Sequence, residues 1–165
     1  MNKIEVALLI PELDKTINKY RQKYDKYKHL EAHLTIYLSD YNGFNNVSNL
    51  ANILETYNRK VVIDKIVKKG KITYLNVKNW KDFTELKEEC VKIFGKEKYK
   101  SNLHITIGYN IPNNEYDIMK KELSNVLPLE VEGSTYKIVL MKEDDAKEYY
   151  IHICNVFKII YFLLK

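Results

Sequence analysis

His33-Leu34-Thr35-Ile36 and His104-Ile105-Thr106-Ile107 share one pattern, His-x-Thr followed by an aliphatic residue, in a chain that holds only four histidines. Side chains alternate between the two faces of a β-strand. A strand would therefore present the histidine and the threonine of each stretch on one face and the two aliphatic residues on the other. Two such strands side by side predict a site with two imidazoles and two hydroxyls, a set suited to acid–base chemistry on a phosphate.

The composition is typical of one globular domain. With 165 residues, 45% of them hydrophobic and 30% charged, the chain is long enough to bury a core. Its net charge of +5 suits an anionic ligand but is too small for the dense basic stripe of a duplex-binding protein. We expect a single domain over residues 1–165, a monomer, with no duplex DNA as partner.

Cysteine usage and the two apolar runs predict a cytoplasmic protein without a membrane anchor. Cys90 and Cys154 lie in apolar segments without metal-ligand spacing, as reduced core thiols do. The run at residues 6–10 is too short for a secretion signal and has no cleavage site. The run at residues 156–164 is interrupted by Lys158 and is too short to span a bilayer, so we expect it to complete a core strand.

Apolar periodicity predicts alternating strands and helices. Each motif strand is preceded by a helix and followed by a polar turn and another helix, which indicates a duplication. We therefore expect an α+β fold of two pseudo-symmetric α/β lobes, whose antiparallel sheets form a shared concave cleft. The predicted strands cover residues 4–10, 32–38, 60–67, 71–77, 103–109, 136–141 and 148–157, and the predicted helices cover 12–27, 48–57, 81–94 and 114–126.

Paired His-x-Thr-x motifs in two similar lobes resemble the 2H phosphoesterase superfamily over essentially the whole chain. That superfamily includes 2′–5′ RNA ligase-like proteins, 2′,3′-cyclic phosphodiesterases and viral enzymes that destroy 2′,5′-linked or cyclic immune nucleotides. The resemblance implies a phosphoric diester hydrolase that needs no metal and no cofactor, with His33, Thr35, His104 and Thr106 as catalytic residues. It favours His104 as the base and His33 as the acid, whereas the residues alone leave that order open.

The sequence departs from the family pattern at two kinds of position. Ala32 and Leu103 precede the motif histidines where relatives often have proline, which affects entry into the strand and not the chemistry. Tyr109 stands where many ligase-like members have an arginine, so a guanidinium clamp on the phosphate is in doubt. We expect Tyr37, on the face of His33 and Thr35, and Tyr109 to stack on a base or ribose. Lys100, or its neighbours Lys96 and Lys98, would supply positive charge.

The predicted substrate is a nucleotide or oligonucleotide with a 2′-oxygen at or next to the scissile phosphate. Three kinds compete: a 2′,3′-cyclic phosphate, a 2′,5′-oligoadenylate, and a cyclic di- or oligonucleotide messenger such as 2′,3′-cGAMP. The alternative function is a non-catalytic RNA- or nucleotide-binding protein on the same fold. A third is a structural protein that binds its partner through the hydrophobic C-terminus.

The other two histidines, His29 and His152, have no threonine two residues after them. His29 and His33 have the spacing of helical zinc ligands, but Glu31 is one position off the protease motif and no third ligand is evident, so we expect no metal site. His152 lacks a threonine partner, and we expect it to be structural.

Overall fold

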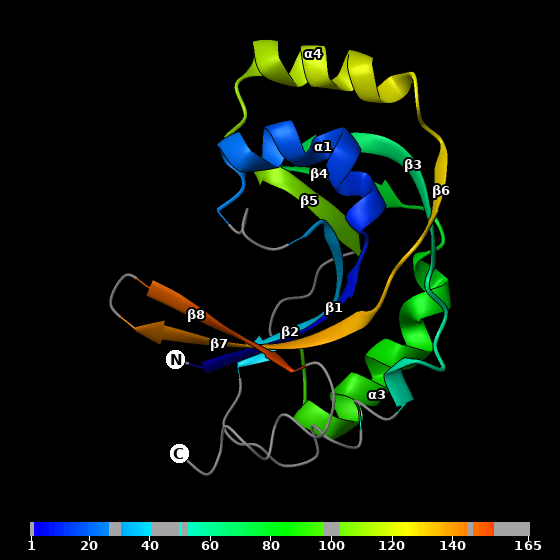
Figure 1. Cartoon of the computed structure of the whole chain (residues 1–165), viewed down its shortest axis with the longest axis vertical. Coiled ribbons are helices and arrows are strands. Elements are labelled where there is room, and N and C mark those ends of the chain that lie inside the picture. Colours follow the sequence, from blue (N-terminus) through cyan, green and yellow to red (C-terminus); the bar gives the residue numbers. More distant parts are fainter. Residues whose placement is uncertain are drawn as a thin grey trace.

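The computed structural model describes residues 2–26, 31–40, 50, 53–97, 103–144 and 147–153. These residues form two antiparallel sheets of four strands each, together with helices (Figure 1). The α+β class with two antiparallel sheets, predicted from the alternation of apolar patterns, is confirmed.

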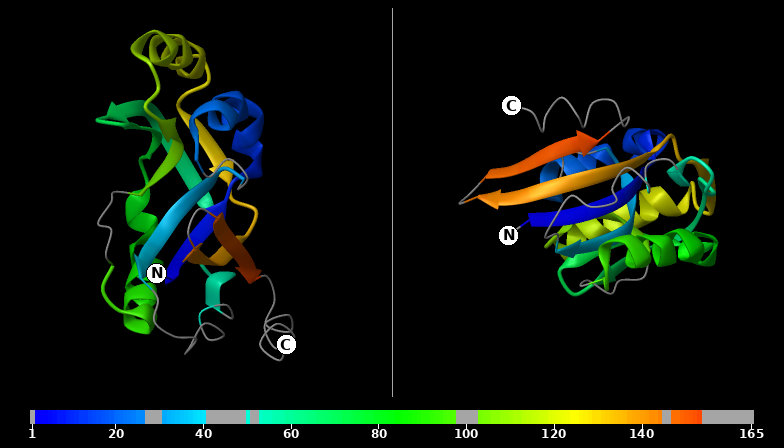
Figure 2. Two further views of the ribbon diagram at one scale, coloured as in Figure 1. Left: turned by 90° about the vertical axis from the view of Figure 1, so that its left-hand side faces the viewer. Right: turned by 90° about the horizontal axis from the view of Figure 1, so that it is seen from below.

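The first sheet joins the beginning of the chain to its end. Its strand order is β2-β1-β7-β8, and Figure 2 shows β7 between β1 and β8. The continuous aliphatic run of β1 is buried on both faces, as expected for a central strand. The motif strand β2 forms one edge of this sheet. The strands are β1 (Asn2–Leu9), β2 (His33–Asp40), β7 (Tyr136–Asp144) and β8 (Lys147–Ile153).

The second sheet is built from the middle of the chain in the order β5-β4-β3-β6. Gly70, with φ +59°, turns β3 back into β4, which confirms the predicted hairpin. The second motif strand, β5, forms one edge of this sheet. The strands are β3 (Lys60–Lys69), β4 (Ile72–Val77), β5 (His104–Tyr109) and β6 (Leu129–Glu132).

Two of the helices each pack on the sheet that does not contain the strand before them. Helix α1 (Pro11–Tyr24) follows β1 of the first sheet but packs against β5 of the second. Helix α3 (Thr84–Phe94), preceded by the 3-10 turn η1 (Trp80–Phe83), follows β4 of the second sheet but packs against β2 of the first. This reciprocal packing of α1 and α3 agrees with the predicted pseudo-symmetry of the two lobes. The first lobe is not one continuous half of the sequence, because β7 and β8 from later in the chain join β1 and β2.

Helix α4 (Asn113–Ser124) packs on β3, next to α1 (Figure 1). Two ion pairs join the helices, Lys19 to Glu122 at 2.5 Å and Lys23 to Glu115 at 2.7 Å. The hydrogen bond from Lys23 lowers the pKa of the Glu115 carboxyl. Solvent screens exposed ion pairs of this kind, so they contribute little to the free energy of folding.

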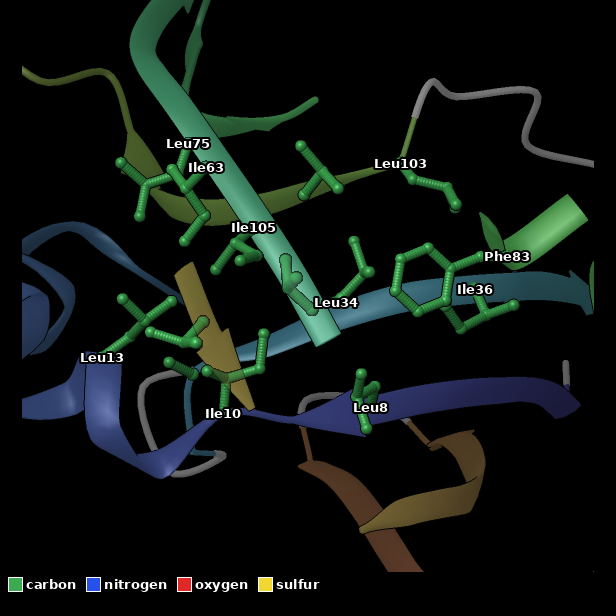
Figure 3. Packing of buried hydrophobic residues seen from close by; sticks show 14 of the residues in the cluster. Leu8, Ile10, Leu13, Leu34, Ile36, Ile63, Leu75, Phe83, Leu103 and Ile105 are labelled. Carbon is green, nitrogen blue, oxygen red and sulfur yellow. The ribbon is translucent and has the colours of Figure 1, made fainter. Parts of the chain in front are cut away.

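One hydrophobic core lies between the sheets and helices. Figure 3 shows Leu34 of β2 near Ile105 of β5, and Ile36 of β2 next to Phe83 of η1. The aliphatic residues of both motifs belong to this single cluster, together with residues of β1, β3, β4, α1, η1 and α3. Such burial contributes about 25 cal/mol per Å² of apolar surface, so these residues anchor the motif strands.

Most predicted elements are confirmed within a few residues. Strand β6 was missed because it has only four residues, and one repeat of alternating apolar and charged residues is too short to identify a strand. Of the predicted helix at 48–57, residues 50, 53 and 54 are helical and 55–57 form a turn; the others lie outside the described residues. Cys154 and the apolar run 156–164 also lie outside them.

Candidate active site on the two motif strands

The two motif strands lie next to each other, each at the edge of its sheet. Leu34 and Ile36 of one strand and Ile105 and Ile107 of the other are completely buried in the common core. Side chains of a strand alternate between faces, so the histidines and threonines point away from this core. All four are partly exposed: His33, Thr35, His104 and Thr106. The structure thus brings both motifs, as predicted from their pattern, to neighbouring edges with their polar faces accessible.

Both motif strands carry an irregularity at the same position. Thr35 pairs with Ala7 and Tyr37 with Val6, which leaves Ile36 as an extra residue. Thr106 pairs with Tyr74 and Gly108 with Thr73, which leaves Ile107 as an extra residue. A β-bulge of this kind reverses the alternation of faces beyond it. The residue directly after each bulge therefore points into the core.

The bulge shows that one predicted site residue, Tyr37, was misplaced. Simple alternation puts it on the face of His33 and Thr35, but its side chain is completely buried. Its hydroxyl donates to the carbonyl of Gly95 at 3.0 Å, and its ring lies 5.8 Å from that of Phe94. Burial raises the pKa of Tyr37, as is typical of a core phenol. Tyr37 cannot stack on a substrate, so this part of the prediction is wrong.

In the second motif strand, glycine occupies the position equivalent to Tyr37. A Cβ on Gly108 would lie 2.5 Å from the Cβ of Tyr24 and 3.0 Å from its backbone carbon, so glycine lets α1 pack directly on β5. One residue further, Tyr109 returns to the face of His104 and Thr106. There the Lys26 ammonium lies 5.7 Å from the centre of the Tyr109 ring, a cation–π distance. Tyr109 is thus partly exposed on the face of His104 and Thr106, where the bulge and not simple alternation places it.

The imidazole of His33 is held at both nitrogens. Nδ1 lies 2.8 Å from the carbonyl oxygen of Glu31, and because a carbonyl only accepts, Nδ1 carries the proton of this bond. Nε2 lies 3.5 Å from Oε1 of Glu5, and the same oxygen accepts a 2.5 Å hydrogen bond from the Thr35 hydroxyl. Nε2 is therefore the nitrogen available for proton transfer, with a carboxylate beside it.

A buried ion-pair network fixes the residue that precedes His33. Arg21, only 1% exposed, donates through Nε and Nη2 to Asp25 at 3.0 Å and through Nη1 to Asp14 at 3.1 Å. Both carboxylate oxygens of Asp14 accept from the Ala32 amide, at 3.1 and 3.2 Å. The Ala32 carbonyl in turn accepts from the Ile10 amide at 2.7 Å. These bonds fix the backbone at the entry to β2.

His104 lies beside the aromatic ring of Tyr74 and opposite Asn76 of the neighbouring strand β4. The Tyr74 ring lies 4.6 Å from the imidazole, tilted by 49°. Asn76 pairs directly with His104 across the strands, so the two share a face. The Asn76 amide donates to Asp64 at 2.7 Å, which orients it. Base stacking and amide hydrogen bonding are thus available beside the second motif.

Sequence reasoning missed Glu5, Tyr74 and Asn76. Glu5 had a detectable signal, because it is the one charged residue between Ile4 and Ile10 in an otherwise aliphatic strand. Tyr74 and Asn76 had none, since their role depends on pairing with β5. Among the other predicted residues, Lys100, Lys98 and His29 lie outside the described residues. The backbone of His152, in β8, pairs with that of Val139 in β7.

With its two four-stranded antiparallel sheets, this chain has the LigT-like fold of the 2H phosphoesterases. A structure described as a phosphoesterase matches with a TM-score of 0.60 and 10% identity, over 93% of this chain and 96% of its own. E. coli LigT complexed with NADP+ matches with a TM-score of 0.59 and 11% identity. The same protein with 3′-AMP matches with a TM-score of 0.56 and 10% identity; each LigT match covers 93% of this chain and 95% of LigT.

At these identities the likeness is one of fold. The sequence itself matches no protein-family model and no curated protein. Within the described ranges, no three His, Cys, Asp or Glu side chains are grouped so that they could hold a metal ion. No helix in the same part of the chain has the length and apolar character that crossing a membrane requires.

Proposed function

We propose that the protein is a metal-independent phosphodiesterase that acts on RNA-like nucleotides with a 2′-oxygen at or next to the scissile phosphate. The observation that carries this proposal is the pairing of the motifs. His33 with Thr35, and His104 with Thr106, occupy matching positions on neighbouring edge strands and are anchored by one core. A protein that only binds nucleotides has no need of two imidazoles held in this way.

In the proposed reaction the two histidines act as base and acid. One neutral imidazole removes a proton from the nucleophile, which is water or the neighbouring ribose hydroxyl, and the other donates a proton to the leaving oxygen. The hydroxyls of Thr35 and Thr106 donate to the non-bridging oxygens, where charge grows in the transition state. In the free protein the Thr35 hydroxyl donates to Oε1 of Glu5, so the phosphate must replace Glu5 as its acceptor.

Aromatic side chains next to the motifs support a nucleotide as substrate. Tyr74 and Tyr109 are partly exposed on the face of His104, and Lys26 adds a positive charge beside Tyr109. Stacking on such rings is worth about 1–3 kcal/mol per base. The solved structures of E. coli LigT with 3′-AMP, NADP+ and ATP show nucleotides bound to that protein. Lys100 stays a predicted source of further positive charge.

A substrate screen tests the proposal. The purified protein is incubated with 2′,3′-cyclic mononucleotides, 2′,5′-oligoadenylate and 2′,3′-cGAMP, and the products are separated by chromatography. We expect at least one of them to be hydrolysed, and a purely deoxy, 3′–5′ linked dinucleotide to be resistant. Equal cleavage of the deoxy dinucleotide would contradict the requirement for a 2′-oxygen. Tight nucleotide binding without turnover of any compound would establish the non-catalytic alternative.

A further inference from the structure

Lys65 and Lys69 of β3 lie on the face of the second sheet that carries the second motif. Lys65 pairs with Asn76 of β4, which in turn pairs with His104 of β5. Lys69 pairs with Ile72, at the end of β4 next to the hairpin turn. Residues paired across neighbouring strands point to the same side of a sheet. The two lysines therefore share the side of His104, two strands away from it, a backbone separation of about 10 Å.

The intervening residues of β3 agree with this orientation. Ile66 points to the other side of the sheet, where it is buried in the core. Lys68 also points to that side, and its ammonium donates to Oδ1 of Asn113, the first residue of α4, at 2.6 Å. Lys65 and Lys69 are exposed. Of the three lysines in this stretch, one thus joins β3 to α4, and two lie on the face of the motif.

The ammonium groups of Lys65 and Lys69 are unpaired within the described part of the chain, where neither forms an ion pair or a hydrogen bond. Lys60, at the other end of the same strand, contrasts with them, because its ammonium lies 2.7 Å from Oε1 of Glu130. Asp64, next to Lys65 in the chain, accepts a hydrogen bond from a side-chain amide of β4 at 2.7 Å. Two exposed cations are therefore available to an anionic ligand on this face.

Tyr74 lies between the second motif and these lysines. It pairs with Thr106 on one side and, on the other, with Val67, which is midway between the two lysines in β3. Its ring is partly exposed and lies 4.6 Å from the imidazole of His104. A nucleobase can stack on such a ring. From β5 to β3, the same face thus carries the motif side chains, a ring for a base and two cations.

We propose that Lys65 and Lys69 bind a second, uncleaved phosphate of the substrate while the motifs hold the scissile one. The proposal rests on the proposed function and narrows its substrate class to a nucleotide chain or ring with at least two phosphates. Neighbouring phosphates of such a molecule are one nucleotide apart, a separation that two strand spacings and flexible lysine side chains can match. A 2′,3′-cyclic mononucleotide has one phosphate and cannot occupy both places.

Ligands that differ only in a second phosphate test this site. Diadenosine joined by one phosphate is compared with the same molecule carrying a further phosphate at one end or at the other, and with 2′,3′-cGAMP. The linkage is the internucleotide linkage that the wild-type protein cleaves fastest, or 2′,5′ if none is cleaved. Dissociation constants are measured by calorimetry with the His104→Ala protein, in which the proposed function predicts that the linkage stays intact. The wild-type protein gives kcat/KM for the same compounds.

Two double variants are introduced into both proteins. The β3 double variant, Lys65→Gln with Lys69→Gln, removes both charges from the proposed site. The α4 double variant, Lys120→Gln with Lys121→Gln, is the matched control, because it removes two exposed charges from the helix that packs on β3 from the other side. Thermal melting of each variant checks that it is folded.

We expect a two-phosphate ligand to bind about 10- to 100-fold more tightly than the one-phosphate ligand, as a charge-assisted contact allows. The β3 double variant should lose this advantage and bind the one-phosphate ligand within about 3-fold of its parent, because a distant exposed charge is screened. The α4 double variant should keep the advantage, and so should Lys65→Arg with Lys69→Arg. For a substrate that is cleaved, the loss should appear as a higher KM with kcat little changed.

The same measurements distinguish a chain from a ring as the source of the second phosphate. Weaker binding of a linear two-phosphate ligand by the β3 double variant assigns the site to a chain. Weaker binding of 2′,3′-cGAMP assigns it to a ring. Either result supports the second-phosphate site.

Three results overturn the proposal: no gain in affinity from a second phosphate, a gain that the β3 double variant keeps, and equal losses in the two double variants. The last of these indicates general attraction by positive charge rather than a site. All three leave the proposed function intact if a compound of the screen is cleaved. Binding that depends on Lys65 and Lys69, without cleavage of any compound, would instead overturn the proposed function and leave the phosphate site standing.

Discussion

Glu5 and Ile72 occupy equivalent positions beside the two motif strands, Glu5 opposite Leu38 of β2 and Ile72 opposite Tyr109 of β5. The same frame of paired strands and bulges therefore places a carboxylate beside the first motif strand and an aliphatic side chain at the matching position beside the second. The Glu5 carboxylate accepts from the Thr35 hydroxyl of the first motif, whereas Ile72 has no polar group to offer the second.

Each motif histidine should be indispensable. The base and the acid act in one displacement, so His33→Ala and His104→Ala should each lower kcat by about two to four orders of magnitude. His152→Ala, on the strand at the opposite edge of the first sheet from β2, should stay active. Turnover on the best substrate is measured alongside thermal melting. Near-normal turnover of a folded His33→Ala or His104→Ala variant would show that the two-histidine mechanism is wrong.

The motif threonines should differ in their effect on stability. Thr35→Ala and Thr106→Ala should each cost about 1–3 kcal/mol of transition-state stabilisation, because a hydroxyl contributes one hydrogen bond to the phosphate. Thr35→Ala also removes the hydroxyl partner of the buried Glu5 carboxylate. It should therefore melt at a lower temperature than Thr106→Ala. Equal melting temperatures would contradict the role assigned to the bond between Thr35 and Glu5.

Activity should survive a strong chelator. The proposed acid–base chemistry uses only side chains, so dialysis against EDTA should leave the rate on the best substrate unchanged. The control is EDTA followed by added zinc or manganese, which should not raise the rate. If EDTA abolishes activity and zinc or manganese restores it, the result would contradict the metal-independent mechanism and favour a metal site that includes His29 and His33.

Replacement of Gly108 by alanine should destabilise the folded protein. A Cβ there meets the Tyr24 Cβ at 2.5 Å and its backbone carbonyl oxygen at 3.1 Å, so α1 must move away from β5. We expect Gly108→Ala to lower the free energy of unfolding by about 1–3 kcal/mol, as overpacking does. Gly70→Asn is the control, because the turn has open space and asparagine tolerates a positive φ. Chemical denaturation measures both; equal stability of Gly108→Ala and wild type would refute the close contact.

The Cys90 thiol should be inert in the folded protein. Burial raises its pKa to about 12, and the thiolate is the reactive form, so almost none is present at pH 8. The variant Cys154→Ser leaves Cys90 as the only thiol of the chain. It should fail to react with a disulfide reagent at pH 8 until guanidinium unfolds it. Rapid labelling of the native variant would show that Cys90 is accessible.

The sequence by itself determined what depends on local pattern. Alternating aliphatic and polar residues predicted both motif strands, and His33, Thr35, His104 and Thr106 all lie on the polar faces that simple alternation assigns to them. The turn at Gly70 and the amphipathic face of α1 were also readable, because each depends on neighbours in the chain.

Tertiary structure decided what depends on partners far away in the chain. The bulges at Ile36 and Ile107 arise from pairing with β1 and β4, and they turned Tyr37 into the core while returning Tyr109 to the polar face. Glu5 meets His33 and Thr35 only because β1 lies beside β2. Local patterns set which face a side chain takes along an uninterrupted strand, whereas the register between strands decides where that alternation breaks and which side chains meet across it.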